Sequence, residues 1–218
     1  MEELSAESDD APRSLHFLSV LEPRRSLIGL PHVKPLTSYA EKLLEEGYGE
    51  VQVPYFDPLD GGINARALFL MEKPGPMTAT GSAGKKAGSG FISRNNDDPT
   101  AENICHFMRQ AEIPREQTVL WNIIPAWNGT LKITSTEHQQ GINHVHELLA
   151  LLPQLRVIVM VGSRDAKAKS LLEGAGLPLL FSAHPSPILR ATNVVKWNTI
   201  PLEWAKVHMY LSADSNLV

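Results

Sequence analysis

Four short apolar runs, separated by segments of helical length, constrain the fold of this 218-residue chain more than any other feature. The runs are residues 67–70, 116–124, 156–161 and 177–183. Short apolar strands that alternate with helices are typical of a parallel sheet covered by helices on both faces. The pattern predicts a single three-layer α/β/α domain with a central, mainly parallel four-stranded sheet.

The segments around these runs carry helix signatures. Helices are expected over residues 35–48, 98–111, 134–152 and 198–211, and from Ser163 onward. Asp98 and Thr100 are both candidate N-caps of the second of these helices. Residues 78–96 are rich in glycine and small polar side chains, so we expect an irregular loop there.

The charge of the chain is unevenly distributed. Residues 1–12 hold five acidic and no basic side chains, a charge of −5. Because the whole chain has a net charge of −4, the remaining residues carry +1 and are close to neutral. We expect residues 1–12 to form a disordered acidic tail and residues 13–218 to form the α/β/α domain. A near-neutral body with local basic clusters permits weak DNA binding rather than a strong electrostatic grip.

Composition excludes several classes of protein. The single cysteine, Cys105, rules out an intramolecular disulfide and a cysteine-based metal cage. His144, His146 and Glu147 lack the spacing of a zinc-binding His-Glu-x-x-His helix, and we expect no metal or other cofactor. The longest apolar run is too short for a membrane helix, and the acidic N-terminus does not resemble a signal peptide. A cytoplasmic monomer is therefore expected.

Two proline-bearing turns directly follow the first and the last apolar runs. Residues 71–76 read Met-Glu-Lys-Pro-Gly-Pro, and residues 184–187 read His-Pro-Ser-Pro. The carboxyl ends of parallel strands meet at one edge of a sheet, where open α/β folds hold their ligands. The turns therefore place an acidic group and His184 on opposite sides of one pocket, and an enzyme is the leading interpretation.

Together with Asn122, the two turns resemble the motifs of the uracil-DNA glycosylase superfamily. Residues 184–187 match its His-Pro-Ser-type turn after the last strand. Residues 72–75, Glu-Lys-Pro-Gly, are similar to the Glu-Ala-Pro-Gly turn of the thermostable branch, and residues 74–76 share the Pro-Gly-Pro ending of the single-strand-selective branch. The resemblance covers residues 67–188, more than half of the chain.

This resemblance implies a DNA glycosylase that flips uracil or another deaminated base out of DNA and hydrolyses its bond to deoxyribose. Bond cleavage produces an oxocarbenium-like sugar and an anionic base, which require a water-positioning group and a donor to the base oxygen. The resemblance implies Glu72 for the first role, His184 for the second and Asn122 for pairing with the base edge.

Further residues are expected around the base and along the DNA. Phe91 is the predicted stacking ring for the extruded base, and Lys73 is also placed at the base. Ile188 is the candidate wedge that fills the vacated position in the helix. The other predicted DNA contacts are Ser186, Lys85 and Lys86. The implied partner is DNA that contains a deaminated or damaged base.

Two positions depart from the family pattern. Met71 replaces the usual opening glycine of the first motif, and Lys73 stands where many members carry a water-activating Asp or Asn. Lys73 could pair with Glu72, bind a phosphate, or attack the sugar as an amine. Asn122, Phe91 and Ile188 are also compatible with ordinary structural roles. A catalytically silent nucleic-acid-binding protein with the same fold is therefore the alternative.

Overall fold

The computed structural model describes residues 9–46, 52–79, 81–83, 86–162, 172 and 174–212. For residues 81–83, 86 and 87 it describes the backbone only. The expected helix from Ser163, the tail up to residue 8 and Lys85 lie outside these ranges.

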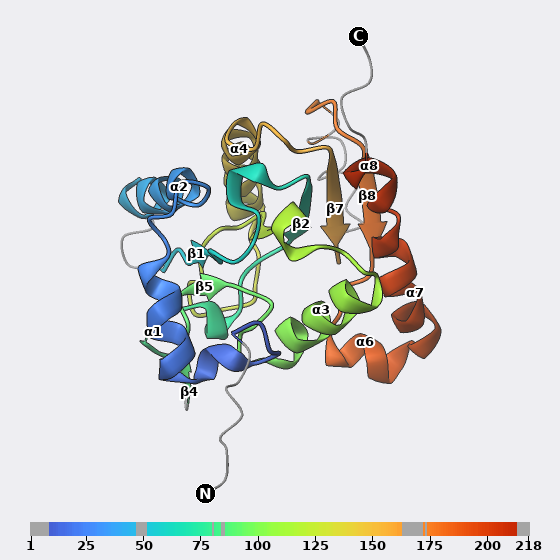
Figure 1. Cartoon of the computed structure of the whole chain (residues 1–218), viewed down its shortest axis with the longest axis horizontal. Helices are drawn as coiled ribbons and strands as arrows, with labels where there is room; N and C mark the ends of the chain where they lie inside the picture. Colours follow the sequence, from blue (N-terminus) through green and yellow to red (C-terminus); the bar gives the residue numbers. More distant parts are fainter. Residues whose placement is uncertain are drawn as a thin grey trace, which may run out of the picture.

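A parallel four-stranded sheet forms the centre of the fold (Figure 1). Its strands are β2 (Ala67–Met71), β6 (Thr118–Asn122), β7 (Val157–Val161) and β8 (Leu179–Ser182), in the spatial order β6-β2-β7-β8. All three neighbouring pairs are parallel. The predicted α/β/α fold with a four-stranded parallel sheet is thus confirmed.

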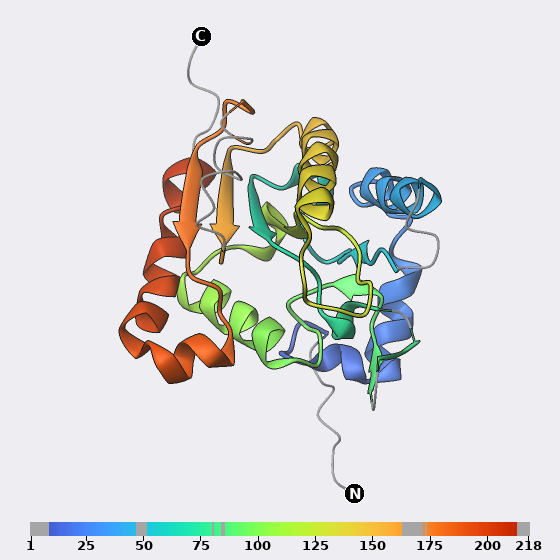
Figure 2. The same ribbon diagram turned by 180° about the vertical axis from the view of Figure 1, so that it is seen from behind.

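Helices cover both faces of this sheet (Figures 1 and 2). On one face, α3 (Pro99–Gln110) packs beside α7 (Val194–Ala205), and the Trp204 ring meets the edge of Phe69 in β2 at 5.1 Å between centroids. On the other face, α2 (Lys34–Glu45) contacts β6 through Tyr39 and Trp121, whose centroids lie 6.2 Å apart. The Tyr39 hydroxyl donates to the His144 carbonyl of α4 (Ser135–Ala150) at 2.6 Å.

Several helix ends are fixed by side-chain caps. Asp98, rather than Thr100, is the N-cap of α3, and Thr134 forms a capping box with Glu137 at the start of α4. The last helix begins earlier than predicted, because Asn193 caps α7 at Val194, and it is followed by the separate short helix α8 (His208–Leu211). The chain also forms α1 (Leu18–Ser26) and α6 (Pro187–Thr192), with 3₁₀ turns at Ser14–His16, Gly62–Asn64, Pro76–Thr78 and Arg115–Gln117.

The glycine-rich segment contains regular structure, so the expectation of an irregular loop over residues 78–96 was wrong there. Strands β3 (Gly81–Ala83) and β4 (Lys86–Gly88) form an antiparallel pair. Strand β5 (Phe91–Ile92) pairs in parallel with β1 (Tyr55–Phe56). These short strands pair through backbone hydrogen bonds, which do not require bulky side chains. The small, polar composition of the segment therefore did not indicate strands.

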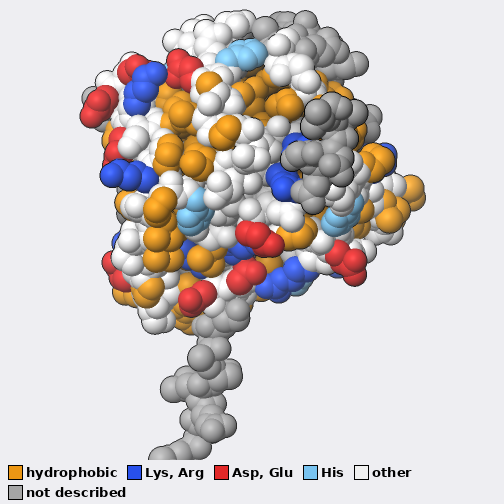
Figure 3. Space-filling model, turned by 45° about the horizontal axis from the view of Figure 1, so that its top comes forward, with side chains coloured by type: hydrophobic (Ala, Val, Ile, Leu, Met, Phe, Trp, Pro, Cys, Tyr) orange, Lys and Arg blue, Asp and Glu red, His pale blue; other side chains and the backbone are white. Residues whose placement is uncertain are grey.

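The end of the predicted tail lies against the domain. The carbonyl of Asp9 accepts a 2.6 Å hydrogen bond from Arg24, and the carboxylate of Asp10 pairs with Arg115. Among the described residues, no helix has the length and apolar character that crossing a membrane requires. On the face shown in Figure 3, basic and acidic side chains are interspersed rather than gathered by sign.

Replacing Leu68 by Ala should lower the free energy of unfolding by about 2–5 kcal/mol, because the side chain is 0% exposed and leaves a cavity in the core. Leu44→Ala is the control, since Leu44 is 42% exposed on α2 and its loss should cost less than about 0.5 kcal/mol. Urea denaturation measures both values, and equal losses would contradict this description of the core.

Candidate active site at the carboxyl edge of the sheet

A pocket of about 510 Å³ lies where β2, β6 and β8 end. Its walls come from the turns after β2 and β8, the segment before α3, the first turns of α3, and the end of β6. The wall is largely apolar and includes Met71, Met77, Ile92, Ile104, Leu120 and Leu131. The polar side chains that line it include Lys73, Ser93, Asn96, Asp98, Asn122, His184 and Ser186. An apolar pocket with a few convergent polar groups is the usual form of a small-ligand site.

His184 lies on the wall of this pocket, held by a tight turn. The carbonyl of His184 accepts from the Ser186 backbone N–H at 2.8 Å, and Asn103 of α3 donates to the Pro185 carbonyl at 3.0 Å. Gly162, at the end of β7, has φ +87°, and a Cβ on it would lie 2.9 Å from the His184 Cβ. Glycine at position 162 therefore leaves the space that the imidazole needs.

The His184 ring is neutral in this setting. Burial lowers its pKa below the ordinary value of a histidine, because a charged imidazolium is poorly solvated there. A neutral imidazole carries one N–H and can still donate one hydrogen bond. The same ring borders a second hollow of about 280 Å³, whose lining includes Thr192 and Lys196.

Asn122 is the most informative polar group of the pocket. Strand β6 directs it to the same side as Leu120, toward α3, and the residue is only 2% exposed. Its side-chain amide makes no hydrogen bond within the part of the chain that the structure describes. Buried amides are nearly always paired. An unpaired amide that faces a pocket therefore indicates a ligand with a complementary polar edge.

The first turn differs from the prediction. Met71 and Lys73 line the pocket, whereas Glu72 is exposed and is absent from the lining, because successive side chains of an extended segment point to opposite sides. Lys73 does not pair with Glu72: its Nζ donates to Glu137 at 3.0 Å and to the Lys132 carbonyl at 2.9 Å. This position does not support Glu72 as the water-positioning carboxylate.

Phe91 is also misplaced as a stacking ring. It is 1% exposed and packs in a separate apolar cluster with Leu15, Val20 and Leu21. Apart from the His184 imidazole, no described aromatic side chain lines the pocket. The loop after the first motif therefore contributes Ile92 and Ser93 to the wall, while Phe91 anchors that loop to α1.

The structure locates some of the predicted DNA contacts, and their roles stay predictions. Ile188 lines the pocket and is 75% exposed, as a wedge at the pocket mouth would be. Ser186 lines the pocket while its Oγ accepts from the Leu189 N–H at 3.3 Å and caps α6. Lys86 lies in β4 with its side chain undescribed, so the roles of Lys85 and Lys86 stay predictions.

The sequence interpretation missed several polar residues of the wall, of which Asn96 and Asp98 are the most informative. Asn96 lines the pocket while its amide is held by Ser89 at 2.6 Å and by the Phe91 carbonyl at 2.8 Å. Asp98 was noted only as a candidate helix cap, although it also lines the pocket. The signal was a run of five polar residues, Arg94 to Asp98, directly after the glycine-rich segment.

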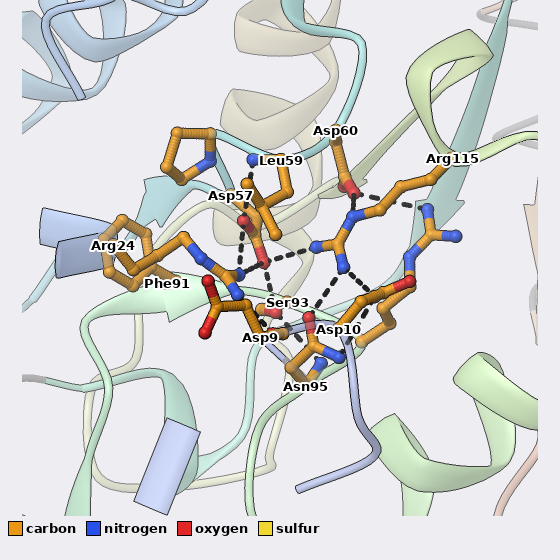
Figure 4. Close-up of polar contacts among 12 residues, drawn as sticks. Asp9, Asp10, Arg24, Asp57, Leu59, Asp60, Phe91, Ser93, Asn95 and Arg115 are labelled. Carbon is orange, nitrogen blue, oxygen red and sulfur yellow. Dashed lines mark hydrogen bonds and ion pairs between the residues drawn. The ribbon is translucent and has the colours of Figure 1, made fainter. Parts of the chain in front are cut away.

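A buried ionic cluster lies beside this wall (Figure 4). The Asp57 carboxylate binds Arg24 at 2.8 Å and Arg115 at 2.7 Å. Asp60 binds Arg115 at 2.9 Å and Arg94 at 3.3 Å. Burial acts to raise the pKa of Asp57, but the two guanidinium groups hold it below its usual value. For Asp60, burial prevails over its arginines and raises the pKa.

The cluster fixes the segment that carries Asn96 and Asp98. Ser93 donates through its Oγ to Asp57, and the same Oγ accepts from the Asn95 backbone N–H at 2.9 Å. Arg115 donates to the Asn95 side chain at 2.7 Å. This part of the pocket wall is therefore held by charged groups that lie outside the pocket.

A family model described as the Uracil DNA glycosylase superfamily matches residues 58–204. The match spans both turns, Asn122 and all four strands of the central sheet. A search of curated proteins gave no significant match.

Replacing Arg115 by Ala should lower the free energy of unfolding by about 3–5 kcal/mol, because it leaves two buried carboxylates short of a partner. Arg25→Ala is the matched control, since its pair with Glu22 is largely exposed and should contribute less than about 1 kcal/mol. Chemical denaturation measures both. A loss for Arg115→Ala as small as that of the control would refute a supporting role for the cluster.

The buried neutral His184 should make stability depend on pH. Below about pH 6.5 the unfolded chain binds a proton at this residue before the folded chain does, so the free energy of unfolding should fall as pH decreases. His184→Asn should lack this contribution. Urea denaturation from pH 8 to pH 5 measures the difference, and identical slopes for both proteins would contradict the buried neutral ring.

Proposed function

Because this chain belongs to the uracil-DNA glycosylase superfamily, we propose that it hydrolyses the N-glycosidic bond of a deaminated base flipped out of DNA. The observation that carries this proposal is the buried amide of Asn122, which has no hydrogen-bond partner among the described residues and lines the same pocket as His184. An amide offers one donor and one acceptor, which match the adjacent N–H and C=O that uracil, hypoxanthine and xanthine share.

His184 has the second role in this proposal. When the glycosidic bond breaks, its electron pair leaves with the base and negative charge develops on a base oxygen. The neutral imidazole donates its N–H to that oxygen from a turn that is already held in place by Asn103 and Gly162. A donor fixed before the reaction stabilises the charge without the cost of reorganisation.

The exposed residues around the pocket suit a DNA partner. Ile188 is the proposed wedge for the position that the flipped base leaves. Ser186 and the backbone of its turn are proposed to contact the phosphates, as are Lys86 of β4 and Lys85. We expect a monomeric, monofunctional hydrolase of base-excision repair.

A second candidate is a protein that binds DNA without hydrolysing it. It is supported by the first turn, where Glu72 lies outside the pocket and Lys73 is occupied by Glu137. In this case Lys73 would hold the first turn against α4 through Glu137, and its pairing argues against the expected phosphate contact.

Single- and double-stranded oligonucleotides that carry uracil, hypoxanthine or xanthine test the two candidates. The glycosylase should convert at least one of them to an abasic site. His184→Ala and Asn122→Ala should each slow that conversion by about 10²–10³-fold, the usual cost of losing one such donor. Gel analysis after alkaline cleavage measures the rate.

Leu202→Ala is the control, because Leu202 is 69% exposed on α7 and does not line the pocket. Oligonucleotide binding without any abasic product would favour the silent binder. Wild-type rates for both pocket variants would refute the site.

A further inference from the structure

Asp98 is the one carboxylate found among the described residues that line the pocket. Its Oδ1 caps α3 by accepting from the backbone N–H groups of Thr100 at 2.9 Å and Ala101 at 3.0 Å. Both hydrogen bonds go to the same oxygen. The other oxygen, Oδ2, therefore has no hydrogen bond from a described residue and is available to a ligand or a water molecule.

The start of α3 is tied to the turn that carries His184. Asn103, little more than one helical turn after the cap, donates to the Pro185 carbonyl at 3.0 Å. The segment that leads into the helix is held by the buried ionic cluster through Ser93 and Asn95. The Asp98 carboxylate is thus placed in the same pocket as His184 by two independent sets of contacts.

A helix cap alone would not identify a reactive group. The second, independent observation is the Asn122 amide, which is 2% exposed, unpaired within the described chain, and lines the same pocket. A base paired with Asn122 brings its sugar into the pocket with it. Met71 and Met77 on the wall of the first turn are apolar, and Lys73 there is cationic, so Asp98 is the anionic side chain of the described wall.

We propose, on the basis of the proposed function, that Asp98 replaces the first-motif acid: it positions the attacking water and offsets the positive charge of the sugar. The bond between C1′ and the base nitrogen breaks, and both of its electrons leave with the base, whose oxygen accepts a hydrogen bond from His184. The water oxygen then forms a bond to C1′, and Asp98 Oδ2 takes the water proton. The products are an abasic sugar and a base anion, which is protonated by solvent.

The environment of Asp98 suits this role. Burial raises the pKa of Asp98, although the backbone N–H groups of Ala101 and Thr100 act in the opposite direction. A more basic carboxylate takes a proton from water more readily than an ordinary one.

Asp98→Asn separates catalysis from capping, because asparagine caps helices about as well as aspartate but cannot accept a proton. We expect this variant to keep the wild-type melting temperature and to lose about 10²–10⁴-fold in base release. Its residual activity should lack the acid limb that protonation of Asp98 gives the wild-type pH profile.

Wild-type base release by Asp98→Asn would overturn the inference and leave the proposed glycosylase intact. Loss of activity in Glu72→Gln, with Asp98→Asn active, would assign the role to Glu72 instead.

A binding measurement tests the carboxylate independently of turnover. The probes are two duplexes, one with a cationic pyrrolidine and one with a neutral tetrahydrofuran in place of the target sugar. Wild type should prefer the cationic duplex by about tenfold or more, and Asp98→Asn should lose this preference while Glu72→Gln keeps it.

The two measurements distinguish the possible failures. The expected preference without base release from any substrate would retain Asp98 as the sugar-facing group and reject the glycosylase. No preference in wild type, or an unchanged preference in Asp98→Asn, would overturn the inference whether or not bases are released.

Discussion

The buried pairing of Asp57 and Asp60 with arginines is the interaction on which the arrangement of the site depends. Its arginines come from α1, from the segment before α3 and from the turn before β6. Charges removed from water are costly unless every group has a partner. The cluster therefore forms only when these distant segments are all in place, and it specifies their arrangement rather than adding much net stability.

The ionic cluster fixes two parts of the pocket wall. Arg115 leads directly into β6, which ends at Asn122, and Arg94 with Ser93 leads into the segment that ends at Asp98. The opposite wall is fixed separately, by the space at Gly162 and by the hydrogen bond from Asn103. Rigid polar groups in a largely apolar pocket stabilise developing charge effectively, because little of their orientation has to change during a reaction.

The sequence was sufficient for the fold and for the positions of His184 and Asn122 at strand ends, because apolar runs and the residues that end or follow them are local signals. The roles of these two residues stay predictions. The sequence did not indicate that Glu72 lies outside the pocket lining, where a side chain one position along an extended segment points away from its neighbours. Phe91 was misjudged because its burial partners, Leu15, Val20 and Leu21, are far away in the sequence. The pairing of Lys73 with Glu137 joins residues 64 positions apart, and no local pattern could have indicated it.

That pairing also explains how a lysine is tolerated in the first motif. Lys73 is nearly buried, with its side chain 3% exposed, and its charge is balanced by Glu137 at the start of α4. The pair is close to neutral as a unit, so it neither repels a cationic sugar strongly nor replaces a carboxylate. A hydrolytic site built around this turn therefore needs its negative charge from another element, and the N-cap of α3 is the described part of the wall that provides one.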